Sequence, residues 1–358
     1  MDLFKGVVLS IIVLLHVVIV GKNDVGDPAP YVQAIYLGLI GFFIISGYFF
    51  KPGRGFKENM RRRIKILFLA LMISAIGMSL ISFAWCSIWG QPTDLDDLLL
   101  CLKRAFCCER IDVNYGDPVP WAICGFSAGY YFLWVVLGAC VLFYAVADYI
   151  RDDWRKGAAA VAVLLAVTIA YRELFTITLP GFLNLSPIAA VFMIAGMYLA
   201  KFDLAGRIES AGVRSKKFWA AFIGCTAGAF AMVYALPPTI NFEYMSFGDY
   251  GGYSAIPYVV EGVLVFIMLY FLFFFLSKVP FISHIFSEIG KHTMGILLLH
   301  IFVAKMILAP FITFDDVVSI TGDFNGPLRI VMAFVTLILS YLICAYGPAI
   351  IKRLRAKE

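Results

Sequence analysis

Long runs of apolar residues dominate the chain and alternate with short polar segments. A transmembrane helix needs about 20 mostly apolar residues, whereas barrel strands alternate polar and apolar positions over about 10 residues. Runs such as VLVFIMLYFLFFFL, at residues 263–276, show no alternation. The pattern predicts an all-α integral membrane protein with about ten transmembrane helices. We expect them near residues 3–20, 32–50, 64–84, 128–148, 157–172, 182–200, 217–236, 257–277, 292–311 and 328–350.

The polar segment between the third and fourth predicted helices has its own helical pattern. Leu95, Leu98 and Leu102 recur at helical spacing, with acidic residues before them and basic residues towards the end of the segment. This order of charges suits the helix dipole. It predicts a short amphipathic helix on the outer membrane face.

Composition excludes a water-soluble fold, because 62% of the residues are hydrophobic and only 15% are charged. With the N-terminus inside, 22 of the 29 lysines and arginines fall in inner segments. The positive-inside rule therefore places both termini in the cytoplasm, as in a multi-pass plasma-membrane protein. The net charge of +5 then reflects topology and contact with anionic membrane lipid, and no nucleic-acid motif is present. Without repeats or a soluble segment, residues 1–358 are expected to form a single transmembrane domain.

The cysteines give no metal pattern. Five of the eight fall in or beside the first outer segment, and their spacing fits no zinc motif. An oxidising exterior would permit a disulfide there, but an odd number leaves the pairing open. These five are Cys86, Cys101, Cys107, Cys108 and Cys124. We expect no bound metal.

Ionisable residues inside a membrane are costly and therefore functional candidates, and the first predicted helix carries two. Lys5 and His16 are eleven residues apart. At about 100° and 1.5 Å per residue, they share one face to within about 20° and lie about 16 Å apart along the axis. A cation at the inner surface would lie below an imidazole near mid-membrane. The alternative is a snorkelling lysine with a histidine that hydrogen-bonds a neighbouring helix.

Several segments together resemble one family. KGVVLSIIVLLH, residues 5–16, resembles the Arg/Lys, ten residues, His signature that opens the membrane-bound acyltransferase-3 family. In the family's order follow LIGFFIISGYFF, the basic FKENMRRRIK, the aromatic GYYFLWVVLGA and HTMGILLLH, which ends in His300. Two features depart from the family pattern. Lys5 stands where Arg is commoner, and Leu39, Ile40 and Gly41 replace an acidic residue or proline, which puts a supporting contact near Ser46 in doubt.

The resemblance implies an acyltransferase that moves an acyl group, with acetyl expected, from acyl-coenzyme A to a hydroxyl of a cell-surface polysaccharide or lipid-linked sugar. We expect a membrane-only member, without a fused esterase-like domain after the membrane part. Such a member would finish the transfer alone or pass the acyl group to a partner, which leaves a homodimer or another polysaccharide-biosynthesis protein open.

The chemistry of the residues agrees with this reading. Coenzyme A is a polyanion on a long flexible arm, so its site needs cytoplasmic cations, which Lys5 and the cluster Arg61, Arg62 and Arg63 would supply. The cluster can equally be a topological anchor. His16 would act as general base or as transient acyl carrier.

Three further residues are candidates for substrate binding. His300 lies nine residues after Lys291, about 13 Å deep, and either orients the reacting groups or makes a packing hydrogen bond. Glu261 would hold acceptor hydroxyls, with an interhelical ion pair as the alternative. Ser46, in the SGY segment, contacts substrate or only allows close helix approach.

The rival reading is a polysaccharide exporter or proton-coupled transporter, because ten helices with a midplane histidine also suit a carrier. Carriers often contain two related halves with broken helices in matching positions, and the sequence shows no such symmetry. The absence of symmetry favours the enzyme.

Overall fold

The computed structural model describes residues 2–19, 40–88, parts of 94–103, 131–175, 179–235, 240–241, 246–247, 255–304 and 326–355. The chain divides into two compact units that interleave along the sequence. The first unit comprises Met1–Gly26, Met72–Tyr130 and Val279–Glu358, and the second comprises Asp27–Leu71 and Tyr131–Lys278.

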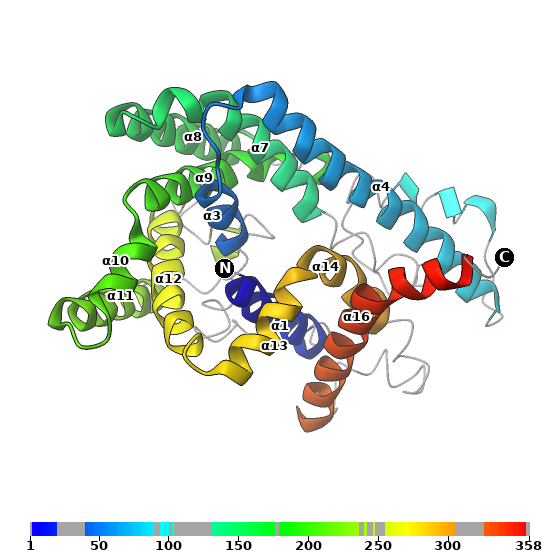
Figure 1. Ribbon diagram of the computed structural model, residues 1–358. Coiled ribbons are helices and arrows are strands. Elements are labelled where there is room, and N and C mark those ends of the chain that lie inside the picture. The colour runs from blue at the N-terminus through cyan, green and yellow to red at the C-terminus, as the bar shows by residue number, and fades with distance from the viewer. Residues whose placement is uncertain are drawn as a thin grey trace. The chain divides into compact units, whose positions relative to one another are not determined.

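The second unit is built around α9 (Ser186–Lys201), most of whose side chains are buried. Its neighbours are α3 (Ile40–Tyr48), α7 (Tyr131–Ile150), α8 (Trp154–Leu174) and α12 (Ala255–Leu276), and Figure 1 labels all of them around α9. The other elements are the start of α4 (Gly55–Ile88), the 3-10 helix η3 (Pro180–Leu185), α10 (Leu204–Ala211), α11 (Lys216–Ala235), and the antiparallel pair β1 (Ile240–Asn241) and β2 (Ser246–Phe247).

Two glycines let α3 and α9 touch backbone to backbone. A Cβ atom on Gly47 would collide with the backbone of Met193, and one on Gly196 would collide with the backbone of Ile44. Backbone atoms cannot move aside as a flexible side chain can, so this crossing needs glycine on both helices. The contact fixes α3, and with it the turn that leads into α4.

Replacing Gly47 by alanine should therefore destabilise the protein. Overpacking of this kind costs about 1–3 kcal/mol in the free energy of unfolding. Gly224→Ala is the control, because Gly224 lies in α11 with open space around it and alanine favours a helix. Thermal unfolding in detergent should give a lower midpoint for Gly47→Ala and an unchanged or higher one for Gly224→Ala. Equal midpoints would show that the crossing tolerates a methyl group.

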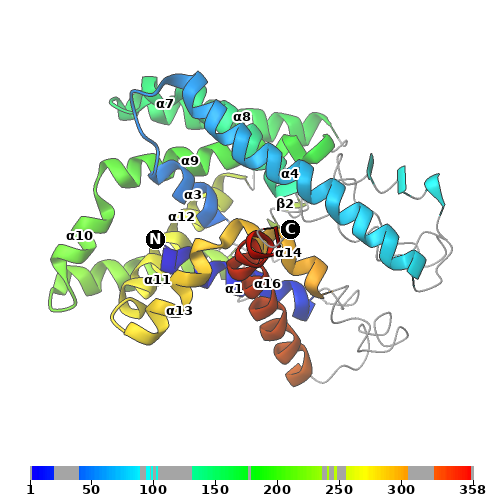
Figure 2. The same ribbon diagram turned by 45° about the vertical axis from the view of Figure 1, so that its right-hand side comes forward.

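The first unit packs the two ends of the chain together. Its described helices are α1 (Asp2–Ile19), α13 (Pro280–Lys291), α14 (Thr293–Phe302) and α16 (Gly326–Arg355). α1 contacts all three of the others, and Figures 1 and 2 both show it beside α13. Glycines again set the distance, because a Cβ on Gly6 would meet the backbone of Phe286 and one on Gly290 would meet Asp2.

The prediction of a helical membrane protein is confirmed, and part of its detail remains a prediction. Within the described residues, five helices are long and apolar enough to cross a membrane: Phe132–Ile150, Trp154–Leu174, Pro180–Lys201, Ala255–Leu276 and Val331–Ala349. All five coincide with predicted spans. The total of ten, the cytoplasmic termini and the amphipathic outer helix stay predictions, as does the single domain. α13 was not predicted, because it lies between the spans expected near residues 257–277 and 292–311.

Candidate functional site

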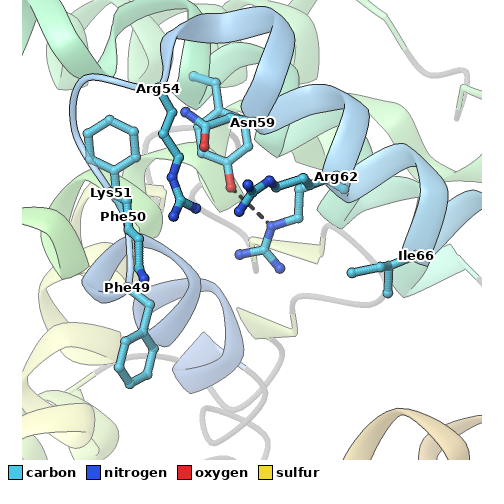
Figure 3. A pocket seen from close by; sticks show the side chains of 9 residues that line it. Phe49, Phe50, Lys51, Arg54, Asn59, Arg62 and Ile66 are labelled. Carbon is cyan, nitrogen blue, oxygen red and sulfur yellow. Dashed lines mark hydrogen bonds between the residues drawn. The ribbon is translucent and has the colours of Figure 1, made fainter.

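A half-open pocket of about 190 Å³ lies where the turn after α3 meets the start of α4. Four cationic side chains line it, namely Lys51, Arg54, Arg62 and Arg63, and none of its lining residues is acidic. Figure 3 shows the guanidinium groups of Arg54 and Arg62 extending toward the same space. A concave surface with this charge attracts an anion, and arginine forks match the oxygens of a phosphate.

The turn that presents Lys51 and Arg54 depends on two glycines. Gly53 and Gly55 have φ angles of 79° and 67°, a region that side chains other than glycine rarely adopt. The Gly53 N–H donates a hydrogen bond of 3.4 Å to the Asp148 carboxylate at the end of α7. The turn is therefore shaped locally and tied to a second helix.

Arg63 is oriented from across the pocket by α7. Its Nε donates a hydrogen bond to the Tyr144 hydroxyl at 3.0 Å, drawn as a dashed line in Figure 3. Tyr144 is packed in turn against Phe143 and Phe50, with ring centroids 5.4 and 6.1 Å away. The bond engages the inner nitrogen of the guanidinium and not the two terminal amino groups, which are the part that grips a phosphate bidentately.

The neighbouring arginines are held less firmly. Arg62 forms an ion pair of 2.9 Å with Glu58, in which both side chains are about half exposed. An exposed pair of this kind contributes only about 0–1 kcal/mol, so an incoming phosphate can replace the carboxylate. Arg61 is exposed on α4 and is not among the residues that line the pocket. Of the three predicted arginines, the structure thus brings Arg62 and Arg63 to one pocket.

In the first unit, α1 carries both Lys5 and His16, as the apolar run at residues 3–20 predicted. Lys5 donates to Asp2 at 3.0 Å and its side chain is 29% exposed. Lys291, at the end of α13, donates to Glu288 at 2.6 Å, and this bond lowers the pKa of Glu288. The N-terminal end of α1 thus lies at a cluster of paired charges, and Lys5 keeps enough exposure to reach a ligand. The side chain of His16 lies outside the described residues.

His300 is buried in α14, and its side chain is 1% exposed. Its Nδ1 lies 3.1 Å from the Ile296 carbonyl, which can only accept, so Nδ1 carries a proton and donates there. The other ring nitrogen, Nε2, is then the one that is able to exchange a proton. α14 packs against α1, so the two helices that carry the predicted histidines are neighbours.

Glu261 and Ser46 belong to the second unit. The Glu261 side chain is fully buried in α12, and neither carboxyl oxygen has a hydrogen-bond partner among the described residues. A buried charge without a partner is very costly, so a polar ligand, a proton or an undescribed group must compensate it. Ser46 is half-buried in α3, next to the glycine at the α3–α9 crossing.

The structure therefore groups the candidates in two sets: Lys5, His16 and His300 in the first unit, and Ser46, Arg61 to Arg63 and Glu261 in the second. Sequence reasoning missed Lys51, Arg54 and Tyr144 as site residues. Lys51 and Arg54 were counted only as topological cations, and Tyr144 lies 81 residues from Arg63, beyond any local pattern. Among the described residues, no group of three or more acidic, histidine or cysteine side chains could hold a metal ion.

The described residues include five helices long and apolar enough to cross a membrane and a pocket lined by four cationic side chains. These features are those of a helical membrane protein that can bind an anion. The family model described as an acyltransferase domain matches residues 1–346, and the chain belongs to this acyltransferase-3 family. Family membership indicates a membrane acyltransferase. No curated protein and no solved structure matches the chain.

Proposed function

We propose that the chain is an O-acyltransferase that takes its acyl group, acetyl in the simplest case, from cytoplasmic acyl-coenzyme A. The observation that carries the proposal is the pocket lined by Lys51, Arg54, Arg62 and Arg63. Its charge suits the phosphates of coenzyme A, and its volume suits a phosphate group rather than the whole coenzyme. The flexible pantetheine arm would carry the thioester away from the pocket to the reacting residues.

The acceptor in this proposal is a hydroxyl of a surface polysaccharide or lipid-linked sugar at the plasma membrane. His16 removes the proton from that hydroxyl, or takes the acyl group first and passes it on. Lys5 assists from the inner end of the same helix, and His300 assists at nearly the same depth as His16. Glu261 offers acceptor hydroxyls its carboxyl, which has no hydrogen-bond partner among the described residues. Membrane lipid surrounds the whole assembly, and no metal takes part.

The test begins with the purified protein in detergent, supplied with acetyl-, propionyl-, butyryl- and succinyl-coenzyme A and with cell-envelope glycans. Release of free coenzyme A thiol should saturate with one of these donors. A protein that binds the glycans and releases no thiol from any donor would contradict the proposal and favour an exporter.

The pocket is tested separately through binding of desulfo-coenzyme A, followed by calorimetry. Arg63→Gln and Arg62→Gln should each weaken binding about 10- to 100-fold, because each removes a charge-assisted hydrogen bond. The difference in affinity between each variant and the wild type should become smaller as the salt concentration is raised, because salt screens the attraction between the arginines and the phosphates. Lys57→Gln is the charge-matched control, because Lys57 is exposed on α4 and does not line the pocket. Equal affinity in all three variants would leave the arginines as a topological anchor.

A further inference from the structure

Two hydroxyl groups in the first unit are buried and have no partner within the part of the chain that the structure describes. Thr336 and Ser340 have side chains with 0% exposure, and neither hydroxyl has a hydrogen-bond partner among the described residues. Most buried hydroxyls in proteins are bonded, and leaving one unsatisfied costs about 1–3 kcal/mol. Thr168 in α8 illustrates the usual solution, since it is equally buried and donates to the Leu164 carbonyl one turn back.

Both hydroxyls lie on the inward face of α16. They are four residues apart, and the buried positions Ala333 and Leu337 belong to the same stripe. The opposite face is exposed at Phe334, as expected for contact with lipid. Because α16 packs against α1 and α14, its inward stripe faces the two helices that carry the predicted histidines.

One contact between α14 and α16 gives the positions of the two hydroxyls along the helix axis relative to His300. A Cβ on Gly295 of α14 would meet the Cys344 sulfur, so these two positions lie at the same height. The predicted topology makes α14 and α16 antiparallel. At 1.5 Å per residue, His300 then lies about 7.5 Å beyond that contact, between Ser340 at about 6 Å and Thr336 at about 12 Å.

We propose that the Thr336 and Ser340 hydroxyls donate hydrogen bonds to the carbonyl oxygen of the acyl group during transfer. This inference rests on the proposed function. In the step, the acceptor oxygen bonds to the carbonyl carbon, its proton passes to the imidazole of His16, and the carbonyl oxygen gains a negative charge. The carbon–sulfur bond then breaks, and the coenzyme A thiolate leaves and takes up that proton. If His16 carries the acyl group instead, the carbonyl oxygen gains a negative charge in each of the two transfer steps, and the two hydroxyls donate to it in both.

The two hydroxyls suit this role for physical reasons. Each supplies one O–H donor, and their surroundings exclude water, so a hydrogen bond to a developing oxyanion is stronger there than in solution. The groups are held on a helix before the reaction, so little reorganisation is needed as the charge develops. The cost of leaving them unsatisfied in the resting protein is recovered when the oxyanion forms.

The experiment compares Thr336→Val, Ser340→Ala and the double variant in the thiol-release assay with the donor that the wild type uses. The expected fall in kcat is on the order of 100-fold for the double variant, with KM for the donor near the wild-type value. Thr336→Ser and Ser340→Thr keep a hydroxyl and should restore most of the rate. Removing an unpartnered hydroxyl should not lower the thermal midpoint, whereas Thr168→Val should lower the midpoint and leave kcat unchanged.

The outcomes separate two failures. Wild-type kcat in the double variant, measured on an active wild-type background, would overturn the role of these hydroxyls and leave the acyltransferase proposal intact. A fall in kcat that is matched by a lower midpoint, and that the hydroxyl-keeping variants do not rescue, would show a structural role instead. A wild-type protein that releases no thiol from any donor would overturn both proposals together.

Discussion

Replacing His16 by alanine should reduce acyl transfer about 100- to 10,000-fold, which is the usual effect of removing a positioned general base. The protein should still fold and insert, because alanine places no polar group in the membrane interior. The change is measured as kcat for thiol release at saturating donor. Binding of desulfo-coenzyme A should be unaffected, since the proposed phosphate site is lined by a different set of residues.

His284→Ala provides the matched control, because this histidine is exposed on α13 and belongs to none of the proposed sites. It should retain wild-type turnover. If His16→Ala also turned over normally, His16 would be a packing residue and the catalytic assignment would have to move to His300. A trapped acyl group on His16, detected by mass spectrometry after rapid quenching, would select the carrier route over the base route.

Transfer should also be strictly sided. The pocket cations belong to segments that the charge distribution assigns to the cytoplasm, whereas Glu261 lies in the part of α12 assigned to the outer half. In proteoliposomes of defined orientation, labelled acyl-coenzyme A is placed on one side and the glycan acceptor on the other. Product should form only when the donor faces Arg62 and Arg63, because in the proposed mechanism the acyl group crosses the membrane and neither the coenzyme nor the sugar does.

The opposite arrangements act as controls in the same experiment. Product that forms only when donor and acceptor share the cytoplasmic side would exclude a crossing step. Movement of the glycan across the bilayer without acylation would support the exporter reading. Leakage is checked with labelled coenzyme A itself, which should stay on the side where it was placed.

The parts of the fold that a sequence specifies locally were predicted well. Apolar runs fix the positions of helices because each helix satisfies its own backbone in lipid. For the same reason the apolar run at residues 3–20 was enough to place Lys5 and His16 on one helix, α1. The family signature, although assembled from short fragments, agrees with a family match to residues 1–346.

Contacts between distant segments could not be predicted. The hydrogen bond from Arg63 to Tyr144 joins α4 to α7, and no spacing rule links residues on separate helices. For the same reason Arg61, Arg62 and Arg63 looked equivalent in sequence, although only the last two line the pocket. Thr336 and Ser340 drew no attention because serine and threonine are common in membrane helices, and only the loss of their usual backbone bonds makes them unusual.

The composition of the first unit has a consequence for biosynthesis. α1 leaves the ribosome first, but the helices it packs against, α13, α14 and α16, all begin after residue 279. At about 5–20 residues per second, roughly 15 to 50 seconds of translation separate α1 from its partners. During that time α1, with Lys5 and Gly6, lies in the bilayer without the three helices that it contacts in the finished structure. The first unit, which holds the proposed reaction centre, therefore assembles last, and a chain interrupted before α13 would insert its earlier helices without completing that unit.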